Sequence, residues 1–216
     1  KIAFDVSPLS HPALGIGNYL RGALGGLAET SAGKHELVAF AVTSLRGPER
    51  IREALAGVDV ELRTWRVPAS HVARTAWSRA QMLAAERLLG EFDVFHFSDW
   101  MYPPQRGGVR ATTIYDLVPL HFREWVTPRT YAMHARKYAN AAATCDVVFA
   151  ISEYTARDVA ETLRVPRERI HVAYPAVKDV FRADGPDADL GEPYVLTVAT
   201  REPRKNLQTL VDAHRL

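Results

Sequence analysis

Short runs of consecutive apolar residues alternate along the chain with longer stretches in which apolar residues recur every three or four positions. The short runs are typical of strands buried on both faces of a sheet, and the longer stretches are typical of helices with one apolar face. The predicted strands span residues 2–6, 37–42, 58–62, 92–97, 109–114, 146–151 and 170–173. The predicted helices span residues 18–29, 49–56, 77–89, 128–143 and 155–163, and residues 63–76 are predicted to be loop.

This alternation of strands and helices predicts an α/β fold, namely a Rossmann-like open parallel sheet with helices on both faces. In such sheets, ligands bind in the loops that follow the carboxyl ends of the strands. The residues directly after each predicted strand are therefore the candidates for a functional site.

A linker divides the chain. Residues 178–193 are rich in Asp, Gly and Pro, and this composition is typical of a connecting segment. We therefore predict one domain in residues 1–177, a linker in residues 178–193, and the first strand, turn and helix start of a second domain in residues 194–216.

The start of the second domain contains a concentration of basic residues. Residues 194–199 are an apolar run that predicts a strand, and a helix is predicted from Asn206. Between them lie Arg201, Arg204 and Lys205. A helix start beside basic side chains favours an anion, although an ordinary basic surface turn would have the same sequence.

Composition and charge narrow the choice of partners. The chain has 47% hydrophobic and 24% charged residues, which is ordinary for a protein with a buried core. The net charge of +2, from 27 basic and 25 acidic residues, argues against nucleic acid as the main partner. Cys145 is the single cysteine, so neither a disulfide framework nor a cysteine zinc site is expected within the chain.

We expect a cytoplasmic protein. No run of about 18 apolar residues is present to span a bilayer, and the first residues do not have the pattern of a signal peptide. Peripheral contact with the inner face of a membrane stays open, because the charged residues are spread too evenly to locate a basic helix face.

Gly15 and Gly17 follow the first predicted strand and precede the first predicted helix. Glycines let a ligand approach the backbone closely, and a helix start favours an anion, although a flexible turn would also use glycine. A dinucleotide fingerprint needs a third glycine where Leu20 stands, and an acid at the end of the next strand, where Thr43 and Ser44 stand. An NAD-dependent oxidoreductase is therefore disfavoured.

Two carboxylates follow neighbouring predicted strands. Asp99 and Asp116 are expected to lie close together, where their oxygens accept hydrogen bonds from sugar hydroxyls. Trp100 and Tyr102 offer aromatic faces for stacking on an acceptor. The alternatives are that Asp116 caps a turn and that Trp100 packs in the core. His96 lies within a predicted strand and is expected to be a core residue.

Other catalytic and metal-binding motifs are missing from the sequence. There is no Gly-x-Ser-x-Gly elbow and no Gly-Lys-Ser/Thr phosphate loop. The histidines have no metal-ligand spacing, so no metal site is expected. Ser152 is predicted to be the N-cap of the helix that follows it.

Six segments resemble, in the same order along the chain, those of the retaining glycosyltransferases of family four, which have the two-domain GT-B fold. The segments are residues 15–19 (Gly-Ile-Gly-Asn-Tyr), 93–96 (Asp-Val-Phe-His), 113–120 (Thr-Ile-Tyr-Asp-Leu-Val-Pro-Leu), 150–158 (Ala-Ile-Ser-Glu-Tyr-Thr-Ala-Arg-Asp), 165–170 (Val-Pro-Arg-Glu-Arg-Ile) and 194–207, with Glu-Pro-Arg-Lys-Asn.

The resemblance implies transfer of a sugar from a nucleotide-sugar donor to an acceptor that is a glycan, a lipid-linked molecule or a small molecule. It implies retention of the anomeric configuration and no required metal or other cofactor. The first domain would hold the acceptor and the second domain the donor. A non-catalytic sugar- or nucleotide-binding module is the alternative.

The resemblance also implies roles for individual residues. Gly15 and Gly17 would lie near the donor phosphates, and Lys205 would stabilise the leaving diphosphate by its charge. Arg201 is expected to assist Lys205, with Arg204 as the alternative.

The chain departs from the family pattern in two places. Many members have histidine where this chain has Tyr115, which can donate a hydrogen bond to the donor sugar but titrates differently. Asp116 is then expected to carry more of the catalytic site. The family's donor-binding carboxylates would lie beyond Leu216, so we expect residues 1–216 alone to be inactive.

Overall fold

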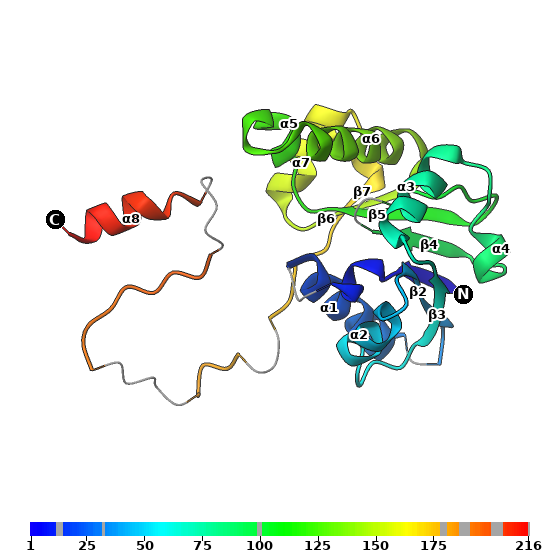
Figure 1. Ribbon diagram of the computed structural model, residues 1–216, viewed down its shortest axis with the longest axis horizontal. Coiled ribbons are helices and arrows are strands. Elements are labelled where there is room, and N and C mark those ends of the chain that lie inside the picture. The colour runs from blue at the N-terminus through cyan, green and yellow to red at the C-terminus, as the bar shows by residue number, and fades with distance from the viewer. Residues whose placement is uncertain are drawn as a thin grey trace.

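The protein has a central parallel sheet with helices on both faces (Figure 1). The computed structural model describes residues 1–11, 15–31, 33–98, 101–177, 181–185, 191–199 and 205–215. This layered arrangement confirms the predicted Rossmann-like α/β fold.

All seven strands of the sheet are parallel, in the order β3-β2-β1-β4-β5-β6-β7. The strands are β1 (Ile2–Asp5), β2 (Leu37–Thr43), β3 (Glu61–Arg66), β4 (Val94–Phe97), β5 (Val109–Ile114), β6 (Val147–Ala150) and β7 (Ile170–Val172). Every residue of β2 is buried, since this strand lies between two others and under helices on both faces, and its sequence is accordingly a continuous apolar run.

Helices connect the strands. They are α1 (Gly15–Thr30), α2 (Gly47–Ala54), α3 (Ser70–Ala80), α4 (Glu86–Leu89), α5 (Val118–His121), α6 (Pro128–Thr144), α7 (Glu153–Leu163) and α8 (Leu207–His214). Short 3-10 turns are η1 (Ser7–Ser10), η2 (Arg123–Trp125) and η3 (Arg167–Arg169). Ser152 caps α7 as predicted, because its hydroxyl accepts a hydrogen bond of 3.1 Å from the amide of Thr155.

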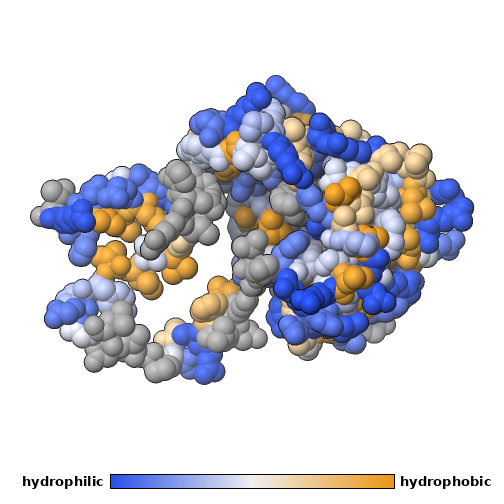
Figure 2. All heavy atoms as spheres, viewed as in Figure 1, coloured by the Kyte–Doolittle hydropathy of each residue, from blue (hydrophilic) through white to orange (hydrophobic). Residues whose placement is uncertain are grey.

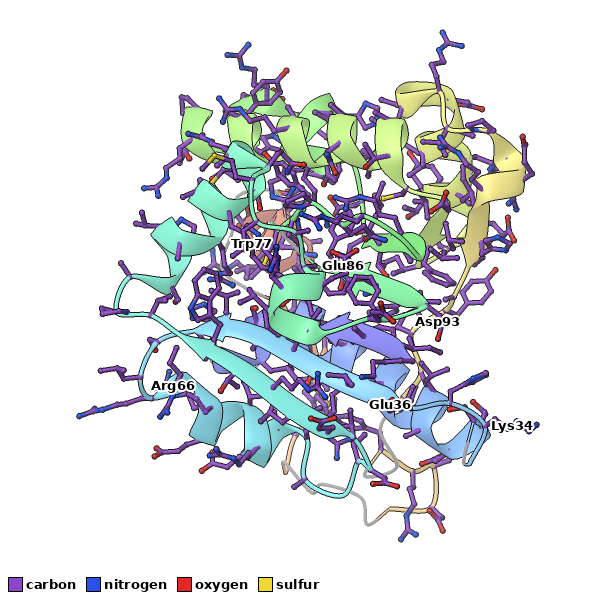
Figure 3. All side chains as sticks on the ribbon, turned by 90° about the vertical axis from the view of Figure 1, so that its right-hand side faces the viewer. Lys34, Glu36, Arg66, Trp77, Glu86 and Asp93 are labelled. Carbon is purple, nitrogen blue, oxygen red and sulfur yellow. The ribbon has the colours of Figure 1, made fainter. Side chains whose placement is uncertain are left out.

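Two apolar cores lie on the two faces of the sheet. On one face α1 and α2 pack on β1 and β2 through residues such as Leu24, Ile51 and Ala39. On the other face α3, α4, α6 and α7 pack on the sheet around Trp77 and Phe95. Figure 3 shows Trp77 between α3 and the sheet.

The two edges of the sheet are distinguished by residues labelled in Figure 3. Arg66 is the last residue of β3 and marks the carboxyl edge. Glu36 and Asp93 directly precede β2 and β4 and mark the amino edge, where Asp93 pairs with the terminal ammonium of Lys1. The predicted functional residues belong to the carboxyl edge.

The helix predicted at residues 77–89 is wrong. α3 ends at Ala80, Gln81 has a left-handed conformation with φ of 53°, and the next helical turn is the separate α4. The Gln81 side-chain amide donates to the backbone oxygens of Ser78 at 2.6 Å and Tyr102 at 3.0 Å. The contact with Tyr102, which is distant in the sequence, stabilises a turn that helical periodicity does not reveal.

The loop predicted at residues 63–76 is also wrong, because it contains the end of β3 and the start of α3. β3 is an edge strand, and edge strands carry charged residues that weaken the apolar pattern. Here Arg63 forms an ion pair of 2.7 Å with Glu61 on the same strand.

The strand predicted at residues 194–199 is not formed. A strand needs a neighbouring backbone for its hydrogen bonds, and within the described residues no strand pairs with this segment. Leu196 is 73% exposed and Val198 91% exposed, and Figure 2 shows apolar side chains on the surface of this segment beside α8. The division of the chain into two domains stays a prediction.

Candidate functional site

The order in which strands are added to the sheet reverses at β1. β1 has β2 on one side and β4 on the other, so successive connections run outward in opposite directions from this point. Ligands of open α/β sheets bind in the crevice where the strand order reverses, outside the carboxyl ends of the strands. The loops after β1, β4 and β5 therefore frame the candidate site.

A buried hydrogen-bond network joins the strands at this point. The Asp5 carboxylate accepts hydrogen bonds from the Ser7 hydroxyl at 2.5 Å and the Ser98 hydroxyl at 2.8 Å. The Ser7 hydroxyl in turn accepts a bond of 3.0 Å from the amide of Val42. Burial raises the pKa of Asp5, while the bonds from Ser7 and Ser98 oppose this rise.

This network was not predicted from the sequence. The sequence feature that could have indicated it is the polar Asp5 near the end of an otherwise apolar run, with Ser7 two residues later. The network fixes the ends of β1, β4 and β2 relative to one another at the carboxyl edge of the sheet.

Gly15 and Gly17 belong to the first turn of α1, whereas the sequence predicted a loop there and a helix only from residue 18. A Cβ atom at Gly15 would meet no protein atom within 4 Å, and one at Gly17 would approach only Leu9, at 3.4 Å. The first turn of α1 contains no acidic residue. Among the described residues, packing thus leaves the space at these two Cβ positions open, which suits the approach of an anion to the backbone.

Tyr115 lies where four elements converge. Its ring meets the ring of Tyr19 edge-on, with centroids 5.3 Å apart. The Tyr19 hydroxyl donates to the backbone oxygen of Ala173 at 3.4 Å, and the Thr155 hydroxyl donates to that of Tyr115 at 3.3 Å. The structure therefore brings the end of β5 beside the starts of α1 and α7 and the segment after β7.

Asp116 is exposed and caps the turn that leads into α5, since its carboxylate accepts a bond of 3.1 Å from the amide of Val118. The Tyr138 hydroxyl donates to the backbone oxygen of Asp116 at 2.9 Å and lies 3.0 Å from Nδ1 of His134. Burial and the nearby charge of Lys137 lower the pKa of His134 to about 4. The hydrogen bond from Tyr138 of α6 thus holds the backbone of Asp116 at the carboxyl edge.

His96 is a core residue, as predicted. It is 2% exposed, stacks on Phe4 with ring centroids 4.4 Å apart, and lies 2.9 Å from the hydroxyl of Thr113. Burial and then the charge of Lys137 lower its pKa to about 3, so the ring is neutral at physiological pH. Lys137 itself is buried, and its ammonium donates to the backbone oxygen of Thr113 at 3.3 Å.

The predicted acceptor residues have different outcomes. Tyr102 is half-buried and tied to α3, because its amide donates to the Ser78 hydroxyl at 3.0 Å and its backbone oxygen accepts from Gln81. Both hydrogen bonds involve its backbone, and its half-burial leaves only part of the residue for a ligand. Asp99 and Trp100 lie outside the described residues.

The predicted donor-binding residues of the second unit are not brought to this edge. Lys205 is exposed and precedes α8, which Figure 1 shows apart from the sheet and its helices. Arg201 and Arg204 lie outside the described residues. The structure therefore leaves the predicted partnership of Lys205 with Gly15 and Gly17 untested.

A pocket of about 290 Å³ lies at the opposite, amino edge of the sheet. Arg110 in its wall donates to the backbone oxygen of Pro103 at 2.7 Å, to Thr144 at 3.0 Å and to Asn140 at 3.2 Å. These protein acceptors take most of the donors of the guanidinium group. We assign Arg110 to holding the loop before β5 rather than to binding a ligand.

Among the described residues, no three His, Cys, Asp or Glu side chains come together in a way that could hold a metal ion. None of the helices formed by the same residues is long and apolar enough to cross a membrane.

Comparison with known families decides the kind of protein. The sequence pattern of Glycosyltransferase Family 4 matches residues 15–180, from the open start of α1 past the end of β7. The chain belongs to glycosyltransferase family 4. No curated protein matches the chain in sequence.

Membership of family 4 confirms the resemblance and implies glycosyltransferase activity, which requires a sugar donor and an acceptor. Within the family 4 region lie Gly15 and Gly17 at the start of α1, and Tyr115 and Asp116 after β5. Lys205 lies beyond it.

Proposed function

We propose that the protein transfers a sugar from a nucleotide-sugar donor to an acceptor with retention of the anomeric configuration and without a metal ion. The open start of α1 supports this proposal most directly. Gly15 has no protein atom within 4 Å of its Cβ position, and the backbone amides there have no acidic residue in the first turn to compete with a phosphate.

The proposed roles follow the charge that develops during the reaction. As the bond between sugar and diphosphate breaks, negative charge grows on the leaving phosphate oxygens. Lys205 and Arg201 supply positive charge to these oxygens, and the amides at Gly15 and Gly17 bind them through the backbone. Tyr115 donates a hydrogen bond to the donor sugar, and the exposed carboxylate of Asp116 accepts one from a sugar hydroxyl.

The two predicted domains divide this work. Residues 1–177 bind the acceptor through Asp99, Trp100 and Tyr102 at the carboxyl edge, and the domain that starts at residue 194 binds the donor. Residues 1–216 alone then lack most of a donor site and do not turn over. We place the enzyme in the cytoplasm, with peripheral contact at the inner membrane face when the acceptor is lipid-linked.

The substitution Gly15→Val tests the donor site. The new side chain meets no protein atom, so the fold is retained, but it fills the space in which the donor phosphates are proposed to lie. We expect KM for the nucleotide-sugar to rise about tenfold or more in the enzyme with its complete donor domain, a change of about 1.4 kcal/mol. Steady-state kinetics with varied donor concentration measures this.

Gly22→Val is the matched control. Gly22 is an exposed residue of the same helix, and a Cβ atom there also meets nothing within 4 Å. The control is expected to keep the wild-type KM. Equal donor KM values for Gly15→Val and wild type would remove α1 from the donor site.

A further inference from the structure

Basic side chains from four segments come together where η1, α2, α3 and α6 meet. Arg129 of α6 lies 3.1 Å from Nε2 of His71 on α3, and Arg50 of α2 donates to the backbone oxygen of Ser10 in η1 at 3.3 Å. α2 and α3 begin directly after the carboxyl ends of β2 and β3, so this group lies at the same edge as the candidate site. We call it the basic cluster: His11, Arg50, His71, Arg74 and Arg129.

Arg74 is the buried member of the basic cluster. Its side chain is 8% exposed, yet no hydrogen bond or ion pair reaches it from any residue that the structure describes. The carboxyl group that interacts with its charge is Asp5, whose oxygens already accept from Ser7 and Ser98 and whose pKa is raised by burial. A largely buried charge without a hydrogen-bonded partner is costly, so an anion that bound to the Arg74 guanidinium would stabilise it.

The start of α3 adds positive partial charge to the basic cluster. Its N-cap residue, Ala69, makes no side-chain hydrogen bond, and its first turn contains no acid. A helix start carries positive partial charge and usually attracts acidic residues. Here His71 lies in the first turn and Arg74 in the next, so the helix start and the Arg74 charge both favour an anion.

The histidines respond to the same charges. Burial and the charge of Arg74 lower the pKa of both His11 and His71, and Arg50 and Arg129 respectively lower them further. Burial is the largest cause for each, and the positive charges of the cluster add to it. A bound anion reverses this effect and favours the protonated rings.

We propose that the basic cluster binds an anionic group of the acceptor, namely a phosphate or a carboxylate. The inference rests on the proposed function, because it assigns the acceptor to residues 1–177. It narrows the acceptor to a molecule that carries negative charge near the hydroxyl that receives the sugar. The residues of the basic cluster are different from the predicted donor residues Gly15, Gly17 and Lys205.

Anion titration without any nucleotide-sugar tests the proposal. Inorganic phosphate and acetate are titrated into the protein at constant ionic strength, and binding is followed by calorimetry. We expect wild type to bind one of them, with Arg74→Gln and Arg129→Gln each weakening the affinity about tenfold or more. Preference for phosphate assigns a phosphorylated acceptor, and preference for acetate assigns a carboxylate.

A control variant keeps the result specific. Arg52→Gln removes an exposed arginine from α2 next to the cluster and is expected to bind the anion as wild type does. Arg129 is exposed, so its variant keeps the test decisive if Arg74→Gln does not fold. No anion binding by wild type, or wild-type affinity in both cluster variants, would overturn the proposal while the donor test with Gly15→Val still stands.

Discussion

Replacing Lys205 by alanine is expected to lower the turnover number by about 2–4 kcal/mol of transition-state stabilisation in the enzyme with its complete donor domain. The ammonium group is proposed to neutralise the charge that appears on the leaving diphosphate only as the glycosidic bond breaks. An interaction made mainly in the transition state changes kcat more than KM. The measurement is kcat at saturating nucleotide-sugar.

Lys205→Arg is the matched variant, because it keeps the positive charge and changes its shape. It is expected to retain more of the rate than Lys205→Ala. Both variants should fold normally, since Lys205 is exposed. An unchanged kcat in Lys205→Ala would show that the leaving group is stabilised elsewhere.

Acid is expected to destabilise the fold through His96. Its folded pKa of about 3 lies below the ordinary value of 6.5, so the unfolded chain takes up the proton first as the pH falls. The contribution of the neutral ring is fully present above pH 6.5 and is lost progressively below it. Between pH 6.5 and about pH 4 the loss is roughly 3 kcal/mol of unfolding free energy from this residue alone.

The variant His96→Phe isolates this contribution. Phenylalanine keeps the stacking on Phe4 and removes the titrating group, at the cost of the contact with Thr113 at every pH. Urea unfolding at several pH values should show the wild type losing stability more steeply than the variant below pH 6.5. A difference between the two proteins that stays constant over this range would mean that His96 does not titrate on unfolding.

The fold could be predicted from local pattern because its strands are buried on both faces. A continuous apolar run such as that of β2 is both the cause of burial and a visible signal. The same reasoning failed at Gln81, where α3 ends because of hydrogen bonds to Tyr102, a residue distant in the sequence. It also failed at residues 194–199, whose apolar run has no neighbouring strand among the described residues.

The site was predictable only where one segment carries the signal. The glycines at the start of α1 and the loop of Tyr115 and Asp116 are local motifs, and the structure places both at the carboxyl edge. Of the two alternatives for Asp116, the structure shows the turn cap, with the carboxylate still exposed.

The basic cluster had no such signal. Basic and acidic residues are spread evenly along the sequence, and the members of the cluster come from four separate segments. Only folding brings these basic residues together, and the first turns of α3 and α6 contain no acid.

Assay of nucleotide-sugars against the enzyme with its complete donor domain tests the central claim most directly. Thermal unfolding with a panel of nucleotide-sugars and with NAD identifies the donor, and NMR of the glycoside product gives its anomeric configuration. We expect one nucleotide-sugar to raise Tm and to be consumed with retention in the presence of an acceptor, while residues 1–216 alone show no turnover. Stabilisation by NAD but by no nucleotide-sugar, or transfer by residues 1–216 alone, would contradict the account.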